Sequence, residues 1–254
     1  MKPLACLLVL IACTSISAAQ LATSAGDPQA TAIAAKARAV LTGNVPVTDV
    51  SLSGSVTSIA GSDTKVGTVT MMASGTTSSR VELDLDAEKT TEIRNASTGS
   101  PQGAWAMNDG PSKTLMQHNE WTDTSWFFPA LTSLSDPNAV LAYIGQEQRG
   151  DASVFHLRSY RRNGSAVGQQ LSQMDFYLDE STYLPIAADF NIHPDDNMNA
   201  NIPVDIVYSD YQRSNGLLVP MHVQKFIQGS LALDITISSV AINTGLQAAQ
   251  FTIQ

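Results

Sequence analysis

The sequence predicts a mainly β protein built on an antiparallel sheet. In residues 231–238, four large apolar residues alternate with small or polar ones, the pattern of a strand with one buried and one solvated face. Asn215-Gly216 and Gly229-Ser230 separate this run from its neighbours, where hairpin turns need residues that tolerate positive φ. Turn-forming residues then recur roughly every ten residues from about residue 46 onward, which predicts a meander of antiparallel hairpins.

The first 19 residues have the organisation of an export signal. Met1-Lys2 gives a short positive end, residues 4–12 form an apolar run, and Ser17-Ala18-Ala19 is a small-residue cleavage site before Gln20. The apolar run is far shorter than the roughly 20 residues that a membrane-spanning helix requires, and no later stretch approaches that length. We therefore expect an exported protein without a membrane span.

The motif Leu10-Ile11-Ala12-Cys13 also resembles a bacterial lipoprotein box, in which Cys13 would become the acylated N-terminus. The sequence leaves both outcomes open, a chain cut after Ala19 or one anchored to lipid through Cys13. The only cysteines are Cys6 and Cys13, so the folded part has no disulfide and depends on its hydrophobic core.

The chain is acidic, with a formal net charge of −9 that becomes one unit more negative when Lys2 is removed. An acidic surface favours solubility and disfavours nucleic acid or an anionic membrane as a partner.

Residues 20–45 are predicted to form a polar leader followed by one helix. Asp27 is a favourable N-cap, Pro28 suits the first helical position and Gly43 suits the C-terminal stop. The apolar residues of this helix share one face, so the helix has to lie on another element. These residues are Ile33, Ala37, Val40 and Leu41.

Residues 46–254 are predicted to form one β domain without an interdomain linker. The expected strands are 47–60, 65–74, 78–85, 88–95, 103–108, 112–118, 143–149, 152–162, 170–180, 185–192, 202–213, 217–228 and 231–243.

One segment, residues 119–142, interrupts the strand pattern. It concentrates four aromatic residues, Trp121, Trp126, Phe127 and Phe128. We expect short helices here that cross the sheet, the second of them beginning at Asp136-Pro137.

The sequence contains no recognisable catalytic or metal-binding motif. The four histidines show no helical metal spacing, and no serine-nucleophile or glycine-rich phosphate motif is present. Asp195-Asp196 lies in an acidic loop that lacks the spaced oxygen ligands of a calcium loop. We therefore expect no enzyme activity, no cofactor and no metal.

Two groups of residues are candidates for binding. Arg158, Arg161 and Arg162 form the one basic group, either a docking spot for an acidic partner or lipid head group, or the solvated end of a hairpin.

The aromatic segment is either the lid of an ordinary core or one wall of an apolar cavity between the sheet and its helices. About 15 methylenes gain roughly 12 kcal/mol on leaving water, which exceeds the low end of the association cost of about 4–15 kcal/mol. An apolar cleft alone can therefore hold an acyl chain. The predicted cavity residues are Trp121, Trp126, Phe127, Phe128, Leu131, Met72 and Met107.

The C-terminal region resembles the LolA-like superfamily of bacterial envelope proteins. The resemblance rests on Tyr208-Ser209-Asp210-Tyr211, Asn215-Gly216, Pro220, Asn243 and Phe251, with Leu178-Asp179 and Tyr183-Leu184-Pro185 before them, and it extends over about residues 28–254. It implies one curved antiparallel sheet, an unclosed half-barrel, whose concave face is covered by the N-terminal helix and short helices. It also implies a periplasmic location and a role in carrying lipoprotein acyl chains or sensing lipoproteins.

These features predict an exported envelope protein that binds a lipid or lipoprotein acyl chains. The alternative is a sensor or scaffold that binds another envelope protein through a sheet edge or the basic hairpin. A hydrolase is the least favoured class, because its motifs are absent.

Overall fold

The computed structural model describes residues 26–43, 45–96, 102–108, 110–119, 121, 124–162 and 166–252. The predicted export signal, with Cys6 and Cys13, lies outside this range. Within the described residues, no helix is both long enough and apolar enough to cross a membrane.

Thirteen strands form one sheet, in the order β6-β5-β4-β3-β2-β1-β13-β12-β11-β10-β9-β8-β7. Their bounds are β1 Asp49–Ala60, β2 Asp63–Ser74, β3 Ser78–Leu85, β4 Glu88–Asn95, β5 Gln102–Met107, β6 Lys113–Thr114, β7 Ala139–Arg149, β8 Ala152–Arg161, β9 Met174–Asp179, β10 Pro185–Ile192, β11 Ile202–Ser214, β12 Leu217–Ile227 and β13 Ser230–Ile242.

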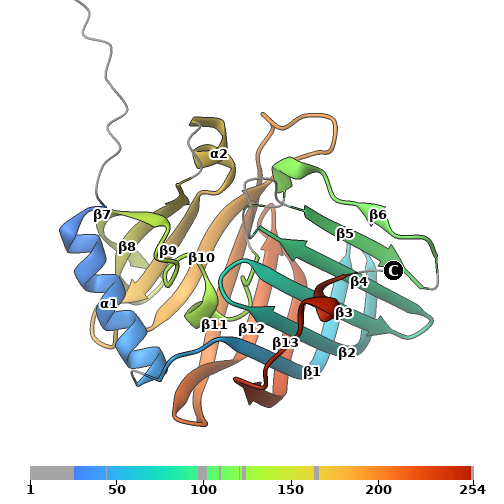
Figure 1. The fold of residues 1–254 in the computed structure, drawn as a ribbon, viewed down its shortest axis with the longest axis horizontal. Helices are drawn as coiled ribbons and strands as arrows, with labels where there is room; N and C mark the ends of the chain where they lie inside the picture. Colours follow the sequence, from blue (N-terminus) through green and yellow to red (C-terminus); the bar gives the residue numbers. More distant parts are fainter. Residues whose placement is uncertain are drawn as a thin grey trace, which may run out of the picture.

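Every pair of neighbouring strands is antiparallel, and the pairing of β1 with β13 joins the N-terminal and C-terminal hairpins. The strands β6 and β7 are the two edges, so the sheet curves without closing (Figure 1). The predicted fold class, an unclosed antiparallel half-barrel, is confirmed.

The hairpin turns lie at the residues that the sequence predicts, except that one turn is shifted by one residue. Asn215 and Gly216 both have positive φ, at 49° and 88°, between β11 and β12. Between β12 and β13 the positive φ angles belong to Gln228 and Gly229, at 52° and 77°, one residue earlier than predicted. Glycine tolerates this conformation without steric cost, which allows the tight connection.

The helix α1 (Pro28–Thr42) begins and ends where the sequence predicts. The Asp27 side chain accepts hydrogen bonds from the backbone N–H groups of Gln29 and Ala30, and Gly43 closes the helix in the left-handed conformation. The buried face of α1 packs on β7, β12 and the 3₁₀ turn η2 (Pro129–Leu131). The residues of this face are Ala30, Ile33, Ala34, Ala37 and Leu41.

The same N-terminal segment protects part of an edge strand. The backbone N–H of Asp27 donates to the carbonyl of Leu141 at 2.8 Å, and the Asp27 carboxylate accepts from the N–H of Tyr143 at 3.3 Å. Two backbone groups on the edge of β7, the carbonyl of Leu141 and the N–H of Tyr143, are therefore paired, which shields this part of the edge from other strands.

The alternation that predicted β13 is also confirmed. Ile235 and Ile237 are buried in the core, Leu231 and Leu233 are partly buried, and Thr236 is exposed. We call the side of the sheet that carries this core the inner face. Residues Val204, Ile206 and Tyr208 of β11 and Val219 and Val223 of β12 lie on it as well.

The prediction of helices in the aromatic segment was wrong. Among its described residues, 124–138 form turns and the single 3₁₀ turn η2, and no helix begins at Asp136. The Asp136 carboxylate instead accepts a hydrogen bond from the N–H of Asn138 at 2.8 Å, and β7 starts at Ala139. Such side-chain bonds to nearby backbone groups compete with helix formation.

Two further boundaries differ from the prediction. The short helix α2 (Ala166–Leu171) precedes β9, where the sequence suggested that a strand begins at 170. The strand expected at 112–118 is limited to β6 and is followed by the 3₁₀ turn η1 (Gln117–Asn119). The C-terminal 3₁₀ turn η3 (Ala248–Phe251) contacts β3 and β4.

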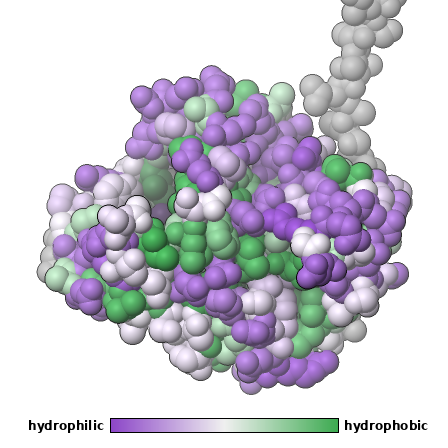
Figure 2. All heavy atoms as spheres, turned by 180° about the vertical axis from the view of Figure 1, so that it is seen from behind, coloured by the Kyte–Doolittle hydropathy of each residue, from purple (hydrophilic) through white to green (hydrophobic). Residues whose placement is uncertain are grey.

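Seen from behind, hydrophobic residues gather across the middle of the molecule and hydrophilic residues surround them (Figure 2). The acidic composition therefore does not give a uniformly polar surface.

Candidate ligand pocket

A pocket of about 410 Å³ lies where β3, β4 and β5 face β12 and β13 across the inner side of the sheet. Its volume falls within the range of roughly 300–1,000 Å³ that is typical of small-molecule sites. It is lined by Val81, Leu83, Thr90, Thr91, Glu92, Trp105, Leu115, Trp126, Lys225 and Leu233.

The strand register determines which side chains reach this pocket. Val81 of β3 pairs with Glu92 of β4, which in turn pairs with Trp105 of β5, so the three residues form one row on the same face. On the opposite side, Lys225 of β12 pairs with Leu233 of β13. The two rows are carried by strands that are distant in the sheet order and meet only because the sheet is curved.

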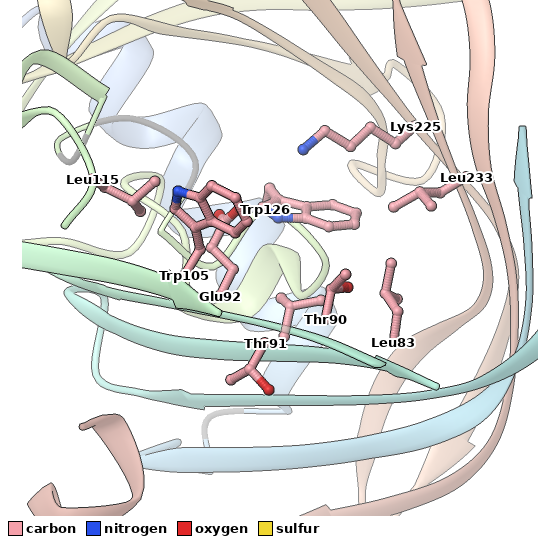
Figure 3. A pocket seen from close by; sticks show the side chains of 10 residues that line it. Leu83, Thr90, Thr91, Glu92, Trp105, Leu115, Trp126, Lys225 and Leu233 are labelled. Atoms are coloured by element: carbon pink, nitrogen blue, oxygen red, sulfur yellow. The ribbon is translucent and has the colours of Figure 1, made fainter. Parts of the chain in front are cut away.

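Two indoles dominate the apolar wall. Trp126 comes from the aromatic segment and is 3% exposed, and its backbone carbonyl accepts a hydrogen bond from the Tyr208 hydroxyl at 2.6 Å. Trp105 is half-buried, and in the close-up it lies beside Trp126 near Leu115, while Leu83 and Leu233 are at the other end (Figure 3). Rigid aromatic and aliphatic walls of this kind suit an apolar ligand.

A charged group borders the apolar wall. The Arg94 Nε donates to the Glu92 carboxylate at 2.8 Å, and the Lys225 Nζ lies 4.8 Å from the centre of the Trp126 ring. Burial raises the pKa of Glu92. The opposing effect of the positive charges of Arg94 and Lys225 and of the hydrogen bond from Arg94 is larger, so the pKa lies below its ordinary value. The pocket thus combines an apolar wall with an ionised pair.

The structure distributes the predicted cavity residues over several environments. Trp126 lines the pocket. Phe127 and Phe128 are fully buried and Leu131 is 3% exposed, so these three belong to the core behind it.

The other three predicted cavity residues lie elsewhere. Met107 is 44% exposed near the end of β5. Met72 points to the outer face of β2, because its neighbours Met71 and Ala73 are fully buried on the inner face. Trp121 borders a hollow of about 10 Å³ next to Arg161, roughly the size that holds one water molecule.

The three predicted docking arginines do not form one exposed patch. Arg158 bonds to the Asp175 carboxylate at 2.8 and 3.1 Å. The Arg161 side chain is only 13% exposed; it pairs with Asp136 at 2.7 Å and donates to the carbonyls of Thr76 and Trp121. Arg162 is exposed.

Most pocket residues were not predicted from the sequence. The alternation in residues 78–85 would have placed Val81 and Leu83 on the inner face, and that signal was available. Lys225 and Glu92 carry no sequence signal for the pocket, because their meeting depends on the curvature that brings β12 opposite β4.

A second polar network lies on the outer face of β7–β11. Arg149 bonds to Asp189 at 3.0 and 3.2 Å and to Asp205 at 2.7 Å, and its guanidinium lies 4.0 Å from the Tyr177 ring centre. Burial and the neighbouring Asp189 raise the pKa of Asp205 to about 6, against the opposing effect of Arg149. No group of residues able to hold a metal ion occurs among the described residues.

The outer face also carries a serine, histidine and aspartate in line. The Ser209 Oγ lies 3.0 Å from the His222 Nδ1, and the His222 Nε2 lies 2.7 Å from Asp234. These residues sit on paired central strands and line neither the pocket nor the hollow beside Trp121. The arrangement by itself is therefore no evidence for a hydrolase.

Solved structures with the same architecture have low sequence identity to this chain. An outer membrane lipoprotein-sorting protein domain from Vibrio parahaemolyticus superposes with a TM-score of 0.59 at 12% identity, covering 88% of this chain and 96% of the other. A LolA superfamily protein from Nitrosomonas europaea gives 0.58 at 12% identity, covering 88% and 97%.

The chain has a LolA-like fold. A DUF1329 family protein from Desulfovibrio piger also shares this fold, with a TM-score of 0.54, 13% identity and coverage of 88% and 96%. No protein-family model and no curated protein sequence matches the chain. The resemblance noted in the sequence is thus confirmed at the level of fold.

Proposed function

We propose that this chain is an exported protein of the bacterial cell envelope that binds a hydrophobic ligand, a lipid or the acyl chains of a lipoprotein. The observation that carries the proposal is the pocket of about 410 Å³ between β3–β5 and β12–β13, walled by Trp105 and Trp126. The LolA-like fold and the predicted export signal of residues 1–19 support the location, and the predicted signal leaves open whether Cys13 is acylated.

The energetics of this pocket favour an acyl chain. About ten buried methylenes contribute roughly 8 kcal/mol, which exceeds the low end of the association cost of about 4–15 kcal/mol. Apolar walls alone can therefore bind such a chain, and no catalytic group is required.

The test is ligand binding by the mature chain purified from a bacterial envelope. Native mass spectrometry should detect co-purifying lipid, and a fluorescent fatty acid should bind saturably to the delipidated protein. If folded, delipidated protein takes up neither this probe nor a neutral acyl lipid, the proposal is wrong.

A second candidate function is the binding of another envelope protein along the β7 edge. Residues 144–148 of β7 lie beyond the part that Asp27 protects, and Ile144 is 48% exposed. No strand in the described part of the chain pairs with this side of β7, and such an edge offers backbone groups to a strand from a partner. A photo-crosslinker at position 144 should capture a specific envelope protein, whereas one at the exposed Met198 should not; equal capture from both positions contradicts this candidate.

A further inference from the structure

Lys225 is a charged residue in an otherwise apolar row. Along the inner face of β12 its neighbours Val219, Met221, Val223 and Ile227 all pack in or against the hydrophobic core. An aliphatic residue at position 225 would continue this row without the free-energy cost of desolvating a charge. Hydrophobic packing alone therefore does not account for a lysine here, and the charge is placed by its contact with the Trp126 ring and its attraction to Glu92.

The position of the amine relates it to the pocket. The Lys225 Nζ lies over the face of Trp126, and the side chain lines the pocket together with Leu233 (Figure 3). The ammonium is thus placed at the boundary between the apolar wall and the polar residues of β4.

We propose that the ligand is a single-chain amphiphile with an anionic head group, in the simplest case a long-chain fatty acid. Lys225 binds the head group, and the acyl chain lies against Trp105, Trp126 and the leucines of the wall. This inference rests on the proposed function, because it requires that the pocket accept an acyl chain.

The chemistry of the ammonium group supports this assignment. It has three N–H donors, so it can bind a carboxylate while it keeps its contact with the Trp126 face and its attraction to Glu92. Hydrogen bonds between two charged groups are shorter and stronger than neutral ones. The site should therefore select an acid over an alcohol of the same chain length.

Glu92 does not prevent an anion from binding. Its carboxylate accepts a hydrogen bond from Arg94 Nε at 2.8 Å, and the Arg94 side chain is only 8% exposed. This nearby guanidinium offsets the negative charge of Glu92 and reduces the repulsion that a ligand carboxylate would meet.

The test compares Lys225→Met with a matched control, Lys113→Met. The Lys113 Nζ lies 4.7 Å from the centre of the Trp105 ring, so it makes the same kind of contact with the other indole without lining the pocket. Dissociation constants are measured for a saturated fatty acid and for the primary alcohol of the same length, by displacement of a neutral fluorescent probe at pH 8. Thermal unfolding verifies that each variant is folded.

We expect the unmodified chain to bind the acid about tenfold more tightly than the alcohol. Lys225→Met should lose this preference and keep its affinity for the alcohol, while Lys225→Arg and Lys113→Met should retain the preference. Equal binding of acid and alcohol by the unmodified chain overturns the inference, and so does an unchanged preference in Lys225→Met; the pocket then remains an acyl-chain site. Failure of the folded protein to bind either compound overturns the proposed function itself.

Discussion

The apolar inner face is covered differently in the two halves of the sheet. Over β7–β12 the inner face is covered by α1 and by the aromatic segment, where Phe127 and Phe128 are fully buried, except near Lys225 of β12, which lines the pocket. Over β3–β5 the inner residues Val81, Leu83 and Trp105 are only half-buried and line the pocket. We refer to these as the packed half and the open half.

In a sheet with one apolar face, the part that the chain itself leaves uncovered is where a ligand can bind. An apolar face must be shielded from water, either by the protein's own helices and loops or by a ligand. In the packed half the chain supplies the cover, so substitutions there should reduce stability. In the open half the cover is incomplete, so substitutions there should mainly reduce ligand affinity.

The largest expected effect is the loss of stability in Phe127→Ala, in the packed half. Removing a fully buried phenylalanine should lower the free energy of unfolding by about 3–5 kcal/mol. Urea denaturation of the ligand-free protein measures this change. A loss below about 1 kcal/mol would show that the packed half is loosely filled, which contradicts the proposed difference between the packed half and the open half.

In the open half, Trp105→Ala should lower ligand affinity more than stability. Burying one large apolar side chain against a ligand contributes about 1.5–3 kcal/mol, so the dissociation constant for a fluorescent fatty acid should rise at least about tenfold. The fall in unfolding free energy should be smaller than in Phe127→Ala. The reverse order of the two effects would mean that Trp105 is an ordinary core residue.

A smaller effect is expected at the start of α1. Asp27→Ala removes the N-cap of the helix and the bond to the Tyr143 N–H, and should cost about 1 kcal/mol of stability. Asp27→Asn, a similarly good cap, is the matched control and should recover most of this loss. Ligand affinity should be unchanged in both variants, because α1 covers the packed half alone.

A pH-dependent effect is expected at Asp205. Because the pKa of Asp205 is raised from 3.8 to about 6 in the folded chain, the folded state holds this proton more tightly than the unfolded state. The stabilisation from protonated Asp205 is present below pH 3.8 and is lost as the pH rises to about 6.

The difference in melting temperature between the unmodified chain and Asp205→Asn should therefore fall across this range. Asp195→Asn, in an exposed loop, is the control for the substitution itself. The affinity for a neutral acyl lipid should not follow the same titration, because Asp205 lies on the outer face. A binding curve that titrates together with the melting-temperature difference would contradict the separation of the two halves.

Most of the fold could be predicted from the sequence. The alternation in 231–238, the turn residues such as Asn215-Gly216 and the caps of α1 are local signals, and local geometry follows from them. The aromatic segment was mispredicted because its conformation depends on tertiary contacts, such as the bond from the Tyr208 hydroxyl to Trp126.

The pocket could be predicted less well than the strands and turns, because it depends on contacts between residues far apart in the sequence. Of the seven predicted cavity residues, Trp126 lines it, while Phe127 and Phe128 pack behind it. Glu92 and Lys225 come from strands that only the curvature of the sheet brings opposite each other. No spacing in the sequence encodes that curvature.

Quenching of tryptophan fluorescence by an acyl chain that carries bromine tests whether the open half of the sheet is the ligand site. The chain has three tryptophans, and variants that keep only Trp105, only Trp126 or only Trp121 report on each position separately. We predict saturable quenching of Trp105 and Trp126 and none of Trp121, which lies outside the pocket. Quenching confined to Trp121, or no saturable quenching at any position, would contradict the assignment of the open half as the ligand site.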